Sequence, residues 1–123
     1  MQDNLNESKS IYLQISEMIE NDILRDILKE EEKVPSTNEF AQFYRINPAT
    51  AGKGVNILVD EGILYKQRGI GMFVSRGAKE MIRNKRKESF EDQYIKSMLE
   101  EARRLNISKE ELITMISHYE EEK

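Results

Sequence analysis

Polar side chains gather at the starts of two short segments near the middle of the chain. Ser36, Thr37 and Asn38 begin the first segment, and Asn47 and Thr50 lie at the start of the second. Hydroxyl and amide groups of this kind hydrogen-bond phosphate oxygens and the edges of bases. Ser and Asn are also among the best N-caps, so the same residues can serve only to cap helices. Both interpretations stay open at this point.

Basic and small side chains close by extend the candidate set. Ala49 can contact a thymine methyl group, and Lys53 follows one helical turn later, where an ammonium group suits a phosphate or a base. Arg45 lies between the two segments and is either a phosphate clamp or an ordinary surface charge. A Gly-rich turn farther along adds candidate contacts at its tip and stems: Lys66, Gln67, Arg68, Gly69 and Ile70.

Catalytic chemistry has little support in comparison. The chain has no cysteine, and its one histidine, His118, lies near the C-terminus. Disulfides, thiolate zinc sites and a cysteine nucleophile are therefore excluded. The spacing Gly69-x-Gly71 is too short for a dinucleotide-binding loop. We expect no enzymatic activity, no metal site and no cofactor.

Charge is distributed unevenly along the 123 residues, whose formal net charge is −4. Residues 36–87 carry ten basic and four acidic side chains, a net charge of +6, whereas residues 1–35 and 88–123 each have a net charge of −5. Phosphates respond to the local surface, because charges are screened beyond a Debye length of about 8–10 Å. The positive stretch coincides with the candidate residues, which favours double-stranded DNA as the partner.

No segment of the sequence is suited to a membrane. Residues 1–7 have neither the positive flank nor the apolar run of a signal peptide. No stretch approaches the ~20 apolar residues that a transmembrane helix requires. We expect a cytoplasmic protein without a membrane partner.

Hydrophobic periodicity predicts three helices in the first half of the chain. Apolar residues recur at helical spacing over about 10–28, 36–44 and 48–61. Ser36 and Glu39 form a capping box that begins the second helix. A proline at the first position suits the start of the third. The charged run between the first two helices is predicted to be a solvated connection.

The pattern then changes to that of strands and back. Residues 63–66 and 72–74 are β-branched, aromatic and apolar on either side of the Gly-rich turn, which predicts a β-hairpin. From about residue 78 the pattern is helical again, with one long helix and then a short one that begins at a Ser108–Glu111 capping box.

This order of elements is that of a winged helix-turn-helix, in which the third helix enters the major groove of DNA. We therefore predict a mainly α fold with a small β-hairpin. A winged helix-turn-helix domain is expected at 8–76, and a helical dimerisation segment with two helices at 77–123.

Several ordered motifs over about 8–76 resemble the GntR-type DNA-binding domain of bacterial regulators. The Asn-Pro-x-Thr start of the third helix and the short C-terminal part look like the YtrA subfamily. The resemblance implies a homodimeric transcriptional regulator, usually a repressor, whose two C-terminal helices dimerise rather than house an effector pocket. In this subfamily the regulated genes are often those of ABC transporters. The matching motifs are Tyr12-x-Gln14-Ile15, Val34-Pro35-Ser36, Glu39-Phe40-Ala41, Asn47-Pro48-Ala49-Thr50 with Lys53, Asp60-Glu61-Gly62-Ile63-Leu64, and Arg68-Gly69-Ile70-Gly71-Met72-Phe73-Val74.

The chain departs from this family pattern at positions that bear on DNA. Asn38 and Ile70 stand where many relatives carry basic residues. Gly52 and Gly54 interrupt the third helix, each at a cost of about 0.5–1 kcal/mol relative to Ala. The low net charge, Asn38 and Ile70 favour one alternative, a winged-helix module that binds proteins and has lost DNA binding.

The C-terminal segment carries more apolar side chains than a two-helix hairpin can bury on itself. This surplus predicts a two-fold homodimer. A dimer that presents two third helices to successive major grooves, about 34–36 Å apart, requires an inverted-repeat operator. The residues predicted to form the dimer interface are Phe90, Tyr94, Ile95, Met98, Leu99, Ala102, Leu105, Leu112, Ile113, Ile116 and Tyr119.

Overall fold

The computed structural model describes residues 2–121, and the side chains of residues 11–119. The chain divides into two compact units, one up to Asn84 and one from Lys85 onward, so the division falls within a helix. Its elements in chain order are α1 (Gln2–Leu24), β1 (Lys33–Val34), α2 (Thr37–Tyr44), α3 (Pro48–Asp60), β2 (Leu64–Gln67), β3 (Gly71–Val74), α4 (Ala78–Phe90), the π-helical turn η1 (Glu91–Ile95), α5 (Lys96–Arg104) and α6 (Lys109–Glu121).

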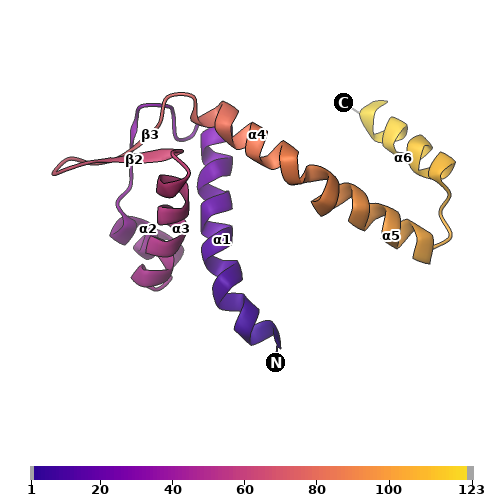
Figure 1. Cartoon of the computed structure of the whole chain (residues 1–123), viewed down its shortest axis with the longest axis horizontal. Helices are drawn as coiled ribbons and strands as arrows, with labels where there is room; N and C mark the ends of the chain where they lie inside the picture. The colour runs from indigo at the N-terminus through magenta and orange to yellow at the C-terminus, as the bar shows by residue number, and fades with distance from the viewer. Residues whose placement is uncertain (1, 122–123) are drawn as a thin grey trace. The chain divides into compact units, whose positions relative to one another are not determined.

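The N-terminal unit is built around α3, which packs against α1, α2 and the strand that follows it (Figure 1). The predicted winged helix-turn-helix is confirmed. Its core draws on both ends of the unit, because the first turns of α4 contribute to it as well as α1. The most deeply buried apolar side chains are Ile19, Ile23, Val55, Leu58, Ile63, Leu64, Val74, Ala78 and Ile82.

The first helix differs from the predicted range of 10–28. It begins at Gln2, because residues 2–9 contain no glycine or proline to end a helix. It ends at Leu24, because Asp26 takes a left-handed conformation with φ 61° and the Ile27 N–H bonds back to the Asp22 carbonyl at 2.8 Å. Leu28 still packs against the core, so the apolar spacing beyond Leu24 reflects a packed turn rather than more helix.

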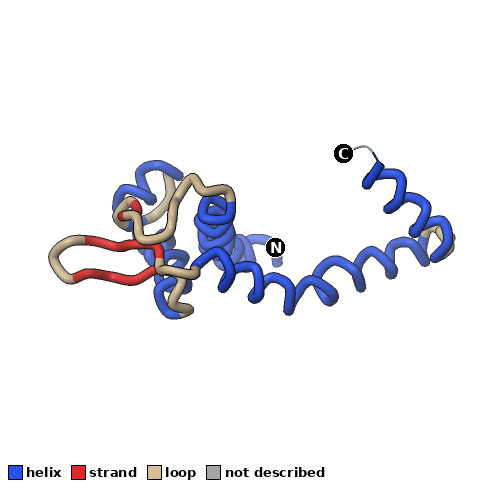
Figure 2. Tube along the Cα trace, turned by 90° about the horizontal axis from the view of Figure 1, so that it is seen from above, coloured by secondary structure: helices blue, strands red, loops and turns tan. Residues whose placement is uncertain are grey.

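The predicted two-stranded hairpin is part of a three-stranded antiparallel sheet with the order β1-β3-β2. Figure 2 shows β2 and β3 side by side, reaching out from the helices as a wing. The short strand β1 pairs Lys33 with Phe73 and Val34 with Met72 on the other edge of β3. Lys33, the last residue of the charged run predicted to be a solvated connection, is exposed but belongs to this strand.

The second and third helices begin where the sequence predicts. The Ser36 hydroxyl accepts a hydrogen bond from the Glu39 N–H at 3.1 Å, and the Glu39 carboxylate accepts one from the Ser36 N–H at 2.8 Å. The Asn47 side-chain oxygen accepts from the Ala49 N–H at 2.7 Å. Gly62, with φ 80°, follows the end of α3. The capping signals are thus confirmed.

The C-terminal unit is helical. The long helix predicted there is interrupted by the π-helical turn η1 before α5. Asn106 has φ 57°, and the Ser108–Glu111 capping box begins α6, with both of its hydrogen bonds formed. Among the described side chains of this unit, only Ala102 and Leu112 are buried. None of the helices in the described part of the chain is long and apolar enough to cross a membrane.

Candidate nucleic-acid interface

A tight turn sets the start of α3 beside the end of α2. Arg45 makes the turn in a left-handed conformation with φ 55°, and the Ile46 N–H bonds to the Ala41 carbonyl at 3.0 Å. The ring of Tyr44 stacks on Phe40 with centroids 6.2 Å apart. Because Phe40 is buried in the core, this contact holds the turn against the body of the unit. Arg45 itself is exposed.

At the start of α2 one candidate residue, Ser36, also caps the helix, whereas Thr37 and Asn38 do not. The capping box uses Ser36 and Glu39. The pKa of the Glu39 carboxyl is lowered, first by the hydrogen bond from the Ser36 N–H and then by the Ser36 hydroxyl. Asn38 is exposed and Thr37 half-buried, so both lie where a phosphate or base can reach them.

The start of α3 presents a second set of exposed residues. Ala49 and Lys53 are exposed and Thr50 is half-buried, whereas the opposite side of the helix, including Ala51 and Val55, is fully buried. The Asn47 side chain is exposed but already caps the helix. Unlike Asn47, the side chains of Ala49, Thr50 and Lys53 take no part in the cap.

The wing is shaped by its glycines. Gly69 has φ 77° with open space around it, and the Ile70 N–H bonds to the Gln67 carbonyl at 2.9 Å to close the turn. Gly71 has φ 141°, and a Cβ there would lie 2.7 Å from the Cε of Lys33. Glycine suits position 71 for two reasons. The backbone conformation there disfavours other residues, and the Lys33 side chain from β1 occupies the space next to a Cβ.

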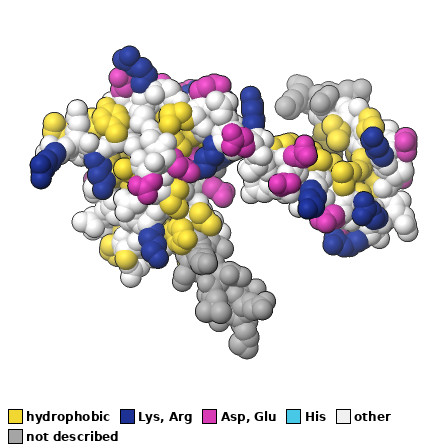
Figure 3. Space-filling view, viewed as in Figure 1, with side chains coloured by type: hydrophobic (Ala, Val, Ile, Leu, Met, Phe, Trp, Pro, Cys, Tyr) yellow, Lys and Arg dark blue, Asp and Glu magenta, His cyan; other side chains and the backbone are white. Residues whose placement is uncertain are grey.

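All the predicted wing contacts are exposed. At the base of the wing the rings of Tyr65 and Phe73 stack with centroids 5.6 Å apart, which stiffens the two strands. Lys and Arg side chains are prominent on the part of the surface that the hairpin forms (Figure 3). The exposed wing residues are Lys66, Gln67, Arg68, Gly69 and Ile70.

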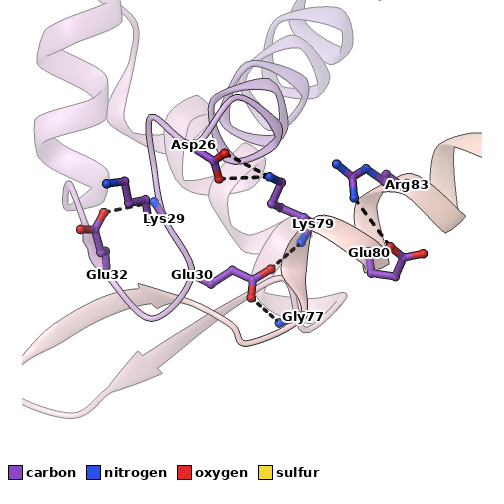
Figure 4. Close-up of polar contacts among 8 residues, drawn as sticks. All are labelled: Asp26, Lys29, Glu30, Glu32, Gly77, Lys79, Glu80 and Arg83. Atoms are coloured by element: carbon purple, nitrogen blue, oxygen red, sulfur yellow. Dashed lines mark hydrogen bonds and ion pairs between the residues drawn. The ribbon is translucent and has the colours of Figure 1, made fainter.

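Four residues that no local sequence pattern marks connect the start of α4 to the loop after α1. The Glu30 carboxylate accepts hydrogen bonds from the N–H groups of Gly77 at 3.0 Å and Lys79 at 3.2 Å, so it caps the start of α4 from a distant loop (Figure 4). These bonds lower the pKa of Glu30. The Lys79 ammonium also bridges the Asp26 carboxylate at 3.1 Å. No local pattern marks these residues, because their partners lie about fifty positions away.

The residues predicted to form a dimer interface fall into two groups. Ala102 is 5% exposed and Leu112 is 8% exposed, so these two are packed within their own unit. The reason is the turn between α5 and α6, where the Ile107 N–H bonds back to the Ala102 carbonyl. The remaining residues are exposed or half-buried: Phe90, Tyr94, Ile95, Met98, Leu99, Leu105, Ile113, Ile116 and Tyr119.

Comparison with models of known protein families identifies one match. The model of the family described as "Bacterial regulatory proteins, gntR family" matches residues 11–74. The chain is 28% identical over 121 residues to the uncharacterized HTH-type transcriptional regulator YhcF of Bacillus subtilis (strain 168), an alignment that covers 98% of each protein. It is 38% identical over 72 residues to the HTH-type transcriptional repressor YtrA of the same organism, covering 58% of this chain and 55% of YtrA. The chain spans less than a third of the length of some other regulators that it matches.

Solved structures resemble the chain as well. A transcriptional regulator of the GntR family from Bacteroides thetaiotaomicron is 35% identical with a TM-score of 0.74, over 91% of this chain and 97% of that one. The AraR(DBD) in complex with operator ORR3 is 33% identical with a TM-score of 0.50, over 52% of this chain and 77% of that one.

Proposed function

Because the chain belongs to the gntR family of bacterial regulatory proteins, we propose that it is a DNA-binding transcriptional repressor that acts as a homodimer on an inverted-repeat operator. The DNA-binding domain is assigned to residues 8–76 and the dimerisation segment to residues 77–123. One observation carries the proposal: the candidate side chains at the starts of α2 and α3 and along the wing are exposed or half-buried, whereas their helices bury only apolar faces.

In this proposal α3 enters the major groove and reads it. Ala49 contacts a thymine methyl group, Thr50 donates to a base or phosphate, and Lys53 reaches an acceptor of a base or a phosphate oxygen. Thr37 and Asn38 at the start of α2 bind the phosphate backbone, where the helix N-terminus favours an anion. The structure of the AraR(DBD) on its operator, a similar domain, supports DNA as the partner.

The wing and the turn add contacts to the backbone. Arg68, with Lys66 and Gln67 behind it, reaches phosphates or the minor groove, and Arg45 clamps a phosphate beside α3. Each neutralised phosphate releases counterions, so affinity depends on salt. The exposed Ile70 contributes an apolar rather than an ionic contact.

The second part of the proposal is the dimer. The apolar side chains left exposed on α5 and α6 supply the surface, with Leu99, Leu105, Ile113 and Ile116 each more than 40% exposed. A second copy of the same helices buries this surface with two-fold symmetry. The similarity to YhcF extends over nearly the whole chain and so includes the C-terminal unit.

The regulated genes are proposed to include those of an ABC transporter, following the likeness to the YtrA group. The protein acts in the cytoplasm, and its chemistry is binding rather than catalysis. No cofactor is required for any of these contacts.

Selection of duplexes from a random DNA library by the full-length protein tests the DNA part of the proposal. We expect an inverted repeat whose half-sites are about one helical turn apart. Lys53→Ala is expected to weaken binding by about 1–3 kcal/mol if Lys53 reads a base. If Lys53 binds a phosphate, the loss of affinity is similar for all DNA sequences. The slope of log affinity against log salt concentration then falls in magnitude by about one unit. Recovery of no preferred sequence favours the protein-interaction module instead.

Light scattering at tens of micromolar tests the dimer. The wild-type chain is expected to have twice the mass of one chain. Ile116→Asp places a charge in the proposed interface and is expected to give a monomer, whereas Ser117→Asp, at the neighbouring exposed position on α6, is the matched control. A wild-type monomer at these concentrations contradicts the dimer.

A further inference from the structure

The helices α1 and α3 approach each other closely at one glycine. A Cβ on Gly54 would lie 2.7 Å from the backbone oxygen of Tyr12 and 3.1 Å from the Cβ of Ile15. The Ser16 hydroxyl donates a buried hydrogen bond of 2.6 Å to the Gly54 carbonyl. The contact fixes α1 against α3 at this point, because it combines a missing side chain with a buried polar bond.

This close approach brings Tyr12 beside the residue before the glycine. The Lys53 ammonium nitrogen lies 5.6 Å from the centroid of the Tyr12 ring. That distance is within the ~6 Å at which the face of an aromatic ring attracts a cation. Tyr12 is half-buried and Lys53 exposed, so the ring is anchored in the unit while the ammonium faces solvent.

We propose that Tyr12 is a positioning residue for DNA recognition, which holds the Lys53 ammonium in place before DNA arrives. The proposal rests on the proposed function, in which Lys53 contacts DNA. Lysine has a long flexible side chain, and ordering it on binding lowers affinity. A lysine side chain that is already held against an aromatic ring loses less conformational freedom when DNA binds.

The pairing leaves Lys53 able to bind. An ammonium group has three N–H donors, and the ring face engages one side of it. The remaining donors can reach a phosphate oxygen or the acceptor atoms of guanine. Lys53 is the only cation within α3, so its position sets where the helix places positive charge in the groove.

Four variants of the full-length protein test this on a duplex that the wild type has selected. Tyr12→Leu removes the ring and is expected to weaken binding about two- to five-fold, the effect of an exposed cation–π contact. Tyr12→Phe keeps the ring and is expected to bind as the wild type does. In a Lys53→Ala background, Tyr12→Leu is expected to have no further effect. Melting temperatures confirm that each variant is folded.

Nuclear magnetic resonance of the DNA-free protein gives a second readout that needs no operator. The ring current of Tyr12 is expected to shift the side-chain protons of Lys53 upfield in the wild type and in Tyr12→Phe. The shift is expected to vanish in Tyr12→Leu. Random-coil chemical shifts for the Lys53 side-chain protons in the wild type contradict the pairing. This readout does not depend on whether any variant folds.

Other outcomes of the binding experiment are equally decisive. If Tyr12→Phe loses as much affinity as Tyr12→Leu, the hydroxyl contacts DNA itself and the positioning role is wrong. If Tyr12→Leu still weakens binding in the Lys53→Ala background, Tyr12 acts independently of Lys53, and the inference is also wrong. A wild-type chain that selects no DNA contradicts the proposed function instead, and the resonance readout then still reports on the pairing.

Discussion

The two compact units of this protein are stabilised by contacts of different range. In the N-terminal unit, hydrogen bonds join residues far apart along the chain: Ser16 to Gly54, Glu30 to Gly77, and Lys79 to Asp26. In the C-terminal unit, the described side-chain hydrogen bonds join residues three or four apart, as in the pair Glu101–Arg104. Contacts of the first kind specify a tertiary structure, whereas those of the second support a helix wherever it lies.

Burial separates the units in the same way. The N-terminal unit has a continuous apolar core contributed by every helix and strand in it, and its described interior includes the start of α4. The C-terminal unit buries only two of its described side chains and leaves residues such as Phe90 and Tyr119 more than half exposed. The first unit therefore encloses its own apolar core, whereas the exposed apolar side chains of the second are the surface that the proposed dimer would bury.

The largest expected effect sharpens that contrast directly. Leu58→Ala opens a cavity in the fully buried core and is expected to lower the free energy of unfolding by about 2–5 kcal/mol. Ile116→Ala, at a position that is 47% exposed, is expected to leave the unfolding of the N-terminal unit unchanged and to weaken self-association. Chemical denaturation followed by circular dichroism at several protein concentrations measures both. Equal losses of unfolding free energy in the two variants would contradict the contrast between the two units.

The next effect concerns the two glycines of α3. Gly54→Ala places a Cβ 2.7 Å from the Tyr12 carbonyl oxygen and is expected to destabilise the protein by about 1–3 kcal/mol. Gly52→Ala meets only the Thr37 side chain at 3.7 Å and is expected to stabilise it by about 0.5–1 kcal/mol. Denaturant unfolding of the two variants should therefore give changes of opposite sign. A stabilising Gly54→Ala would mean that α1 and α3 do not pack through this glycine.

A smaller effect concerns the cap that Glu30 makes on α4. Hydrogen bonds from the Gly77 and Lys79 N–H groups lower the pKa of Glu30 below its ordinary value of 4.5. A carboxyl group whose folded pKa is lowered contributes stability above its unfolded value, and that contribution is lost as pH falls through the folded pKa. Glu30→Gln is expected to reduce stability at neutral pH and to flatten the decline below pH 4.5.

The matched control for Glu30 is Glu88→Gln, an exposed carboxylate farther along α4. Thermal melts of both variants from pH 7 to pH 3 give the comparison. An identical pH profile for the two would show that the cap does not contribute in solution.

The smallest change in stability is expected at the tip of the wing. Arg68→Ala is expected to leave the free energy of unfolding within about 0.5 kcal/mol, because the side chain is exposed, yet to weaken DNA binding. Its salt slope should fall by about 0.9 for one lost phosphate contact. Gly69→Val should instead lower stability as well, since φ is 77° and a β-branched residue is strained there. Operator affinity of Arg68→Ala equal to that of the wild type at physiological salt would leave the wing a purely structural role.

The elements with local signals could be predicted from the sequence alone. Capping boxes and an Asn-Pro pair signal the starts of α2, α3 and α6, because the atoms that cap a helix lie within three residues of its first turn. The Gly-rich turn likewise predicts the wing. These features depend on short spacing, and short spacing is visible in a sequence.

Only the tertiary structure decided the rest. The strand β1 exists because β3 pairs with it, and a two-residue strand has no periodicity of its own. The Glu30 cap, the approach of Tyr12 to Gly54 and the Tyr12–Lys53 pair each join residues more than thirty-five positions apart. Burial of Ala102 and Leu112 depends on how the chain turns after α5. Contacts of this range form only when packing brings distant segments together, so no local pattern records them.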